Sequence, residues 1–276
     1  YATSAAYGVG LGIWLDAETK VEDPGLKFIA PVALGLAGPV GVYFADHPQM
    51  PRGMPAAISA GMMLGAGEGF GIWSYQFTSA KDADEWGFRG LSRAMALGGA
   101  AGGAAGFALA YYQEPSPKTS VLLGSSAVWG ATIGSMVGYG STKAGLDYSE
   151  ANDGASLGGL IGYNLGLGAA AGLSSVWVPS WGQLGYMWMG GGAGWAVGLP
   201  FYLAYAGSDK PAKRGMIFQG ITTTLGIAAG AVFANDIKDN IAEIEEPSRT
   251  KIAKITGFGM MPLQNGAGLQ MQGLLF

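Results

Sequence analysis

One acidic residue, Glu68, lies inside a strongly apolar stretch of the sequence and is the first candidate for chemistry. An ionisable side chain at membrane depth is costly, so such residues move protons or ions, or are held by a partner. Glu68 therefore predicts one of two arrangements. It forms a proton or cation site that faces the interior of a helix bundle, or it lies near the end of a pass, where it snorkels to the membrane surface or pairs with Arg93 or another base.

A second group of polar residues is uncharged and also lies in apolar surroundings. Asn164 is in "GYNLG", and Gln219, Thr222, Thr223 and Thr224 are in "FQGITTTLG". One interpretation is that these side chains line a polar path for a substrate or ion. The other is that they form hydrogen bonds between helices, each contributing about 0.6–2 kcal/mol.

Residues of the types that catalyse reactions do not gather in this sequence. His47 is the sole histidine, and no second histidine or carboxylate pair stands at ligand spacing from it. Neither a metal site nor a histidine-based triad is supported. The chain has no cysteine and a net charge of −4, so it lacks thiolate ligands and the basic surface that neutralises phosphates. We predict no enzyme activity, no metal, no cofactor and no nucleic-acid partner.

The elements that must position these residues are apolar and rich in glycine. The chain has 50 glycines and only 12% charged residues, against about 25% in soluble proteins. No charged residue or histidine occurs in the 55 residues from 154 to 208. A membrane-spanning helix needs about 20 mostly apolar residues. Counted by that length, the chain has eight segments, near 1–15, 27–45, 55–77, 91–112, 119–141, 154–173, 182–206 and 215–234.

Glycine recurs every four residues in several of these segments, as at Gly61, Gly65 and Gly69. That spacing places the glycines on one face of a helix. In lipid, such bare stripes let helix backbones approach closely. We therefore predict an all-α membrane protein of about eight glycine-zipper helices. The glycines predicted to pack between helices are Gly65, Gly69, Gly98, Gly102, Gly130, Gly134, Gly158, Gly162, Gly190 and Gly194.

The segments also repeat in pairs. Gly65, Gly130 and Gly190 align at intervals of 65 and 60 residues, and the second segments align at intervals of 64. A unit of this kind is a two-helix hairpin whose face is buried by its neighbour. The stretches "GVGLGIW" (8–14) and "GEGFGIW" (67–73) are interpreted as one element used twice. Residues 1–235 form the predicted membrane domain, and residues 236–276 a polar C-terminal tail.

A transmembrane β-barrel is the alternative architecture. Glycine alternates strictly at Gly8, Gly10 and Gly12, and "AVWGATIGSMVGY" carries large side chains on one face at a period of two. A barrel would need about five strands within the uncharged run from 154 to 208. Its lumen would also need polar residues at positions that here are Gly, Ala and Met, which favours helices.

Three stretches, "MPRGMPAAISAGMMLGAGEG", "NDGASLGGLIGYNLGL" and "VPSWGQLGYMWMG", resemble an uncharacterised family of Gly- and Ala-rich envelope proteins of myxobacteria and their relatives. The resemblance covers most of the chain and brings no assigned activity or site residues. It implies an integral membrane location in a bacterial cell envelope, with the outer membrane favoured over the inner one.

The sequence thus predicts a structural or assembly subunit of a bacterial envelope, packed through its glycine stripes. Its partners would be the lipid bilayer and other envelope proteins or further copies of the chain. Two alternatives stay open. One is a channel or transporter in which Glu68, Asn164 and Thr222 to Thr224 line the path. The other is an outer-membrane β-barrel pore.

Overall fold

The computed structural model describes residues 1–46, 50–51, 53–80, 84–113, 115–142, 148–208, 211, 213–237, 239, 254–263 and 266–274. His47 lies outside these residues. Within them the chain forms eight α-helices, one 3-10 helix and two β-strands. The elements are α1 (Ala2–Thr19), η1 (Leu26–Phe28), α2 (Ile29–Ala45), α3 (Met54–Ser79), α4 (Gly87–Gln113), α5 (Pro117–Ser141), α6 (Tyr148–Ser174), α7 (Trp181–Ala206), α8 (Arg214–Phe233), β1 (Lys254–Leu263) and β2 (Gly266–Leu274).

The starts of two helices follow from single serines. Ser116 Oγ accepts a hydrogen bond from the Thr119 N–H at 3.2 Å, and Ser180 Oγ accepts one from the Gln183 N–H at 3.0 Å. Both serines are N-caps, which satisfy a backbone donor that has no partner inside the helix. Pro117 occupies the first position of α5, where its missing N–H leaves nothing unsatisfied.

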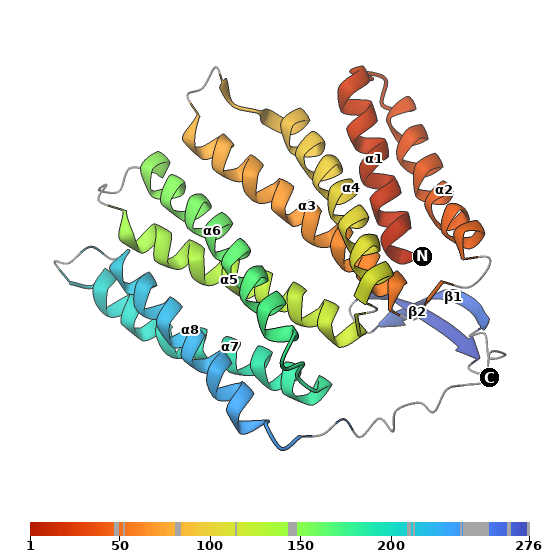
Figure 1. Ribbon diagram of the computed structural model, residues 1–276. Helices are drawn as coiled ribbons and strands as arrows, with labels where there is room; N and C mark the ends of the chain where they lie inside the picture. Colours follow the sequence, from red (N-terminus) through yellow and green to blue (C-terminus); the bar gives the residue numbers. More distant parts are fainter. Residues whose placement is uncertain are drawn as a thin grey trace. The chain divides into compact units, whose positions relative to one another are not determined.

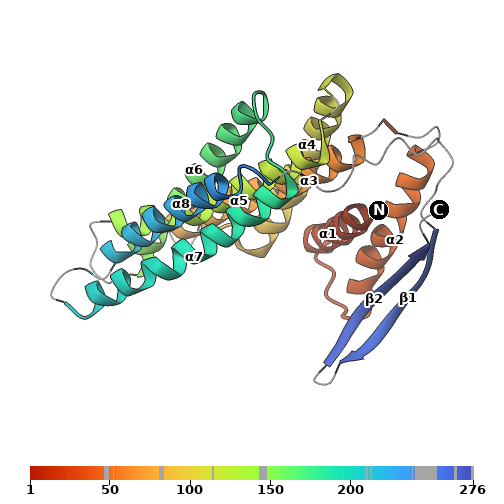
Figure 2. The same ribbon diagram turned by 90° about the horizontal axis from the view of Figure 1, so that it is seen from below.

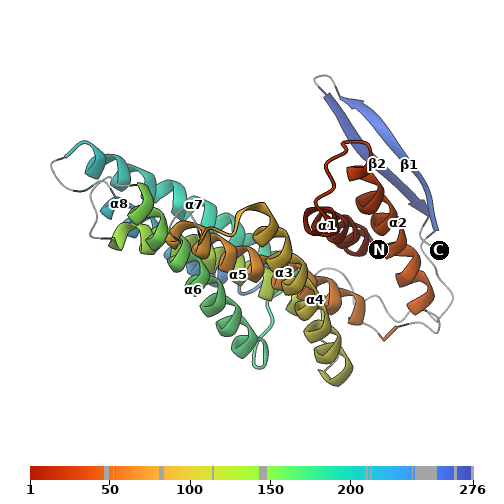
Figure 3. The same cartoon turned by 90° about the horizontal axis from the view of Figure 1, so that it is seen from above.

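Helices pair in the order in which the chain makes them. α1 packs on α2, α3 on α4, α5 on α6 and α7 on α8. The hairpins also contact one another by a constant rule, because the first helix of one hairpin packs on the second helix of the next. The three junctions are α1 with α4, α3 with α6 and α5 with α8. Figure 1 shows the resulting row of hairpins, and Figures 2 and 3 show the same row from below and from above.

The interior of this row is built from small residues. Ala57, Ala110, Ala127 and Ala170 are among its buried residues, and Leu122 is a large side chain that is almost fully buried. Large apolar side chains instead point outward along the helices, as at Leu165, with 68% of its surface exposed. Soluble monomers rarely expose extended apolar surface of this kind, whereas lipid-facing helices must.

Four helical segments are long and apolar enough to cross a membrane. They are Leu26–Ala45, Gly87–Gln113, Pro117–Ser141 and Arg214–Phe233. The prediction of about eight spanning helices is therefore supported only in part. α1, α3, α6 and α7 form helices at the predicted places but are less apolar than these four segments.

The helical architecture itself is confirmed for the predicted membrane region. The ends of the eight helices fall within a few residues of the eight predicted segments, and the largest difference is at the start of α6, Tyr148 instead of 154. The stretch 127–139, which carried much of the case for a barrel, lies within α5. The period-two pattern was wrong there because Trp129, Ile133 and Val137 stand four residues apart, a spacing that also places side chains on one face of a helix.

A second compact unit, Lys238–Phe276, follows the helices. Its described part is an antiparallel pair of strands, in which Lys254 lies opposite Leu274 and Leu263 lies opposite Gly266. The register shifts between Ile255 and Gly257. The sequence predicted a polar tail over 236–276, without strands. Residues 240–253 of that tail lie outside the described residues.

Candidate functional site

The contacts within the hairpins are made by glycine against backbone. A Cβ atom on Gly65 of α3 would overlap the carbonyl oxygen of Gly98 in α4 and lie 2.9 Å from the Cα of Gly102. The relation is reciprocal, because a Cβ on Gly98 would overlap the carbonyl oxygen of Gly65. Real Cβ atoms do not tolerate such distances, so no larger residue fits at these positions without a backbone shift.

The same register returns in the next two hairpins. Gly130 of α5 lies against Gly162 of α6, and Gly190 of α7 lies against Gly226 of α8, each pair in mutual backbone contact. The two glycine series of the repeat thus meet each other position for position. One turn further along, the partner is a glycine only in the middle hairpin. The three pairs at that level are Gly69 with Ala94, Gly134 with Gly158 and Gly194 with Thr222.

The first hairpin also packs through glycine against backbone, but its glycines stand at other positions of the repeat. Gly8 and Gly12 of α1 lie against the backbone of α2, at Leu34 and Pro31. In the aligned stretch "GEGFGIW", however, Gly67 and Gly71 lie against α6 of the next hairpin. The interpretation of the two stretches as one element used twice is therefore wrong for their contacts. A helix turns about 100° per residue, so an offset of two residues moves a position to the opposite face.

Between hairpins, tyrosine hydroxyls bond to backbone carbonyls. Tyr7 of α1 donates to the carbonyl oxygen of Ala96 in α4 at 2.6 Å, and Tyr163 of α6 donates to that of Leu64 in α3, also at 2.6 Å. In both bonds the acceptor is a backbone carbonyl oxygen of a helix, which has a lone pair left for a side-chain donor. Each such bond joins two hairpins.

Glu68 and Asn164 meet at the junction of α3 with α6. Asn164 Nδ2 donates to both carboxylate oxygens of Glu68, at 3.0 and 2.9 Å, and to the carbonyl oxygen of Leu160 at 3.0 Å. Glu68 is the fifteenth residue of the 26-residue helix α3, so it stands in the middle of the helix. The interpretation that places it near a helix end and pairs it with Arg93 is wrong, since Arg93 pairs elsewhere.

Gln219, Thr222 and Thr223 lie in α8, in a different part of the row. Gln219 Nε2 donates to the carbonyl oxygen of Trp195 in α7 at 3.1 Å. Thr222 and Thr223 donate to the carbonyl oxygen of Gln219 within their own helix, at 3.0 and 2.7 Å. Gln219 and Thr223 are buried. The predicted polar residues therefore form two separate clusters, one at α3 with α6 and one at α8 with α7.

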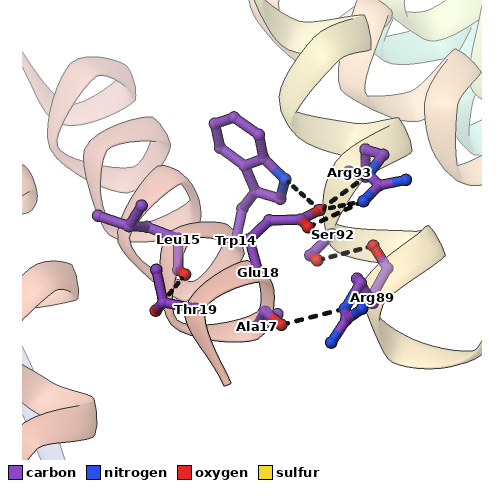
Figure 4. Close-up of polar contacts among 8 residues, drawn as sticks. All are labelled: Trp14, Leu15, Ala17, Glu18, Thr19, Arg89, Ser92 and Arg93. Atoms are coloured by element: carbon purple, nitrogen blue, oxygen red, sulfur yellow. Dashed lines mark hydrogen bonds and ion pairs between the residues drawn. The ribbon is translucent and has the colours of Figure 1, made fainter. Parts of the chain in front are cut away.

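The ion pair at the junction of α1 with α4 was not predicted from the sequence. Arg93 donates from Nε and Nη2 to the two carboxylate oxygens of Glu18, both at 2.8 Å. Trp14 Nε1 donates to the same carboxylate at 3.1 Å, and Arg89 Nε donates to the carbonyl oxygen of Ala17 at 3.1 Å. Figure 4 shows these residues facing each other across the two helices.

Glu18 lies in the last turn of α1, beyond the apolar residues 1–15, where the chain leaves its apolar segment. The hydrogen bonds that Arg93 donates hold the pKa of the Glu18 carboxyl below its usual value. The two groups are 75 residues apart, so only the packing of the two hairpins could reveal the pair.

Among the concave surfaces that the described helices form, two are mostly apolar. An apolar pocket of about 380 Å³ lies where α1, α3 and α4 meet, with Tyr7, Met62 and Met95 among its lining. An open groove of about 710 Å³ runs along α7 and α8, with Met189, Val197 and Leu225 among its lining. Specific small-molecule sites combine apolar walls with a few convergent polar groups. Both surfaces are almost wholly apolar and suit hydrocarbon or another helix.

Comparisons of the chain with models of protein families, with curated protein sequences and with solved structures return no match.

Proposed function

We propose that this chain is an integral membrane protein with a structural or assembly role in a bacterial envelope. The observation that carries the proposal is the reciprocal contact of Gly65 with Gly98, repeated by Gly130 with Gly162 and by Gly190 with Gly226. A contact of bare backbone against bare backbone gives close, rigid packing without polar groups. This glycine contact offers no polar group to a substrate, so the role we propose for it is structural.

A membrane location is supported by the distribution of side-chain sizes. Small residues occupy the interior and large apolar ones the surface, and four segments are apolar enough to span. We propose that α1, α3, α6 and α7 also cross, because each is paired along its length with one of those four. α7, for example, contains no charged residue in 26 positions, which is longer than the roughly 20 that a pass requires.

The envelope location is supported by the resemblance to Gly- and Ala-rich envelope proteins of myxobacteria. We propose the outer membrane in preference to the inner one on the same ground. The lipid bilayer and other envelope proteins or copies of the chain are the proposed partners. A channel or transporter is the weaker alternative, because the polar residues that would line its path lie in two clusters that are satisfied by their own neighbours.

The proposal is tested by two measurements on the full chain. The first is resistance of the membrane-bound chain to extraction at alkaline pH, which we expect for spanning helices. The second compares Gly134→Leu with Gly124→Leu, both in α5. A Cβ on Gly134 would overlap the carbonyl oxygen of Gly158, whereas a Cβ on Gly124 meets no atom within 4 Å.

We expect Gly134→Leu to abolish the folded state in detergent, as followed by thermal melting of the helical circular dichroism signal. Overpacking costs about 1–3 kcal/mol even for an added methylene, and here the obstacle is backbone. Gly124→Leu should melt as the wild type does. Extraction of the wild-type chain at alkaline pH, or equal melting of the two variants, would refute the proposal.

A further inference from the structure

The junctions between the hairpins follow one rule. In all three junctions the first helix of a hairpin packs on the second helix of the next. α7 is the first helix of the last described hairpin, and α2 is the second helix of the first. Within the described helices α1 to α8, α7 has no following hairpin to pack on and α2 has no preceding one.

In α3, the face that includes Gly67 packs on α6 of the next hairpin. Among the described residues, the corresponding face of α7 is not covered by another helix. Gly65 and Gly190 occupy the same place in the repeat, 125 residues apart, so Gly192 corresponds to Gly67. A Cβ on Gly67 would lie 2.9 Å from the hydroxyl of Tyr163, which covers it from the next hairpin. A Cβ on Gly192 would meet no atom within 4 Å.

A comparison of α5 with α7 gives the same result. Val137 of α5 lies 3.4 Å from the position that a Cβ on Gly220 of α8 would take, and it corresponds to Val197, 60 residues later. Val197 keeps 61% of its surface exposed and lines the groove of about 710 Å³. The groove thus begins at the positions where the other hairpins receive a neighbouring helix.

At the other end of the row, α2 carries large apolar side chains that α1 leaves exposed. Phe28, just before α2, and Val32 and Leu36 within it stand four residues apart and are more than half exposed. On the side of α2 that contacts α1, Gly35 and Gly38 lie against Val9 and Ser4. Neither the open face of α7 nor that of α2 has a charged group, so their contact would desolvate no ion.

We propose that α7 of one copy binds α2 of a second copy, head to tail, which continues the rule of the three internal junctions. The small residues Gly192 and Ala193 of α7 receive the large side chains of α2, as Gly67 receives Tyr163 inside the chain. Such an interface is heterologous, so successive copies build a ring or a filament. This inference rests on the proposed structural function and names its partner.

The chain contains no cysteine, so disulfides report only on introduced pairs. Ala193→Cys is placed on α7, and Phe28→Cys, Val32→Cys and Leu36→Cys are placed singly on the α2 face. Full-length chains are purified, mixed in pairs in liposomes of bacterial phospholipid, and oxidised with copper phenanthroline. Non-reducing electrophoresis then gives the cross-linked fraction. A disulfide forms only where Cβ atoms come within about 4.5 Å.

We expect Ala193→Cys to cross-link with one member of the α2 set and each cysteine variant alone to stay uncross-linked. Leu165→Cys is the matched control, because Leu165 and Leu36 are each 68% exposed while Leu165 belongs to a central hairpin. It should not cross-link with Ala193→Cys. A chain with both cysteines should give a ladder of oligomers.

Two results would overturn the inference. The first is a cross-link in a single variant alone, or equal cross-linking with Leu165→Cys, which would mean a symmetric interface or random collision. The second is no cross-link in any mixture, which would mean that lipid covers both faces. Alkaline extraction and melting are measured on the same samples. Wild-type values there with no cross-link would reject the head-to-tail contact alone, whereas extraction of the chain would reject the membrane proposal itself.

Discussion

The contacts inside a hairpin and the contacts between hairpins are built in different ways. Inside, Gly130 and Gly162 bring two backbones together, and the same pair of positions is glycine in three hairpins. Between hairpins, one junction holds an ion pair and the next a carboxylate with an amide. The third holds a hydrogen bond from Lys213 Nζ to Thr142 Oγ1 at 3.0 Å, beside apolar contacts such as that of Gly140 with Ile217. Close backbone contact admits one residue type, whereas a side-chain contact can be made by many.

This difference implies a division of labour. The hairpin is the unit that must form for the chain to fold, because a single added Cβ separates its helices. The junctions then order the hairpins in a row, and each junction can lose a bond and persist. Substitutions should therefore rank by which kind of contact they touch.

The largest effect is expected inside a hairpin, at Gly190 of α7. Gly190→Ala places a Cβ against the carbonyl oxygen of Gly226, so we expect a loss of about 1–3 kcal/mol in the free energy of unfolding. Gly192→Ala, two residues away in open space, should gain up to about 1 kcal/mol from helix propensity. Thermal melting in detergent compares them. Equal shifts of the two variants in the same direction would show that the contact with Gly226 does not set the effect at Gly190.

A smaller effect is expected at a junction, for Tyr163→Phe. The variant keeps the ring over Gly67 but loses the hydrogen bond to Leu64, for a loss of about 1 kcal/mol. Tyr112→Phe serves as the control, because the side chain of Tyr112 is 81% exposed at the end of α4. A melting shift for Tyr163→Phe as large as that for Gly190→Ala would remove the distinction between the two kinds of contact.

The smallest effect is expected at the exposed ion pair of Glu18 with Arg93. The pKa of Glu18 is lower in the folded chain than in the unfolded one. Its contribution to stability is therefore present above the unfolded pKa and is lost as pH falls through the folded pKa. We expect Arg93→Gln to melt slightly below the wild type at pH 7 and to match it once Glu18 is protonated. A difference that persists at low pH would assign the effect to packing of the Arg93 chain.

Much of the helical region could be predicted because its signals are local. The run without charge from 154 to 208 and the turn residues between segments determine where the helices lie. Four-residue spacing puts Gly65 and Gly69 on one face whatever that face contacts. The strands Lys254–Leu263 and Gly266–Leu274 were not predicted. Their 19 residues include five glycines and only two β-branched residues, Ile255 and Thr256, so strand propensity does not indicate them.

The amino-acid sequence by itself determined that the chain makes apolar helices with bare stripes, since period and composition are properties of each segment alone. Only the tertiary structure decided which stripe meets which helix. In the folded chain Gly8 contacts α2 whereas Gly67 contacts α6. Glu18 forms an ion pair with Arg93, and Asn164 donates a hydrogen bond to Glu68. These contacts depend on the rotation of one helix against another, where a shift of two residues reverses the face that is presented.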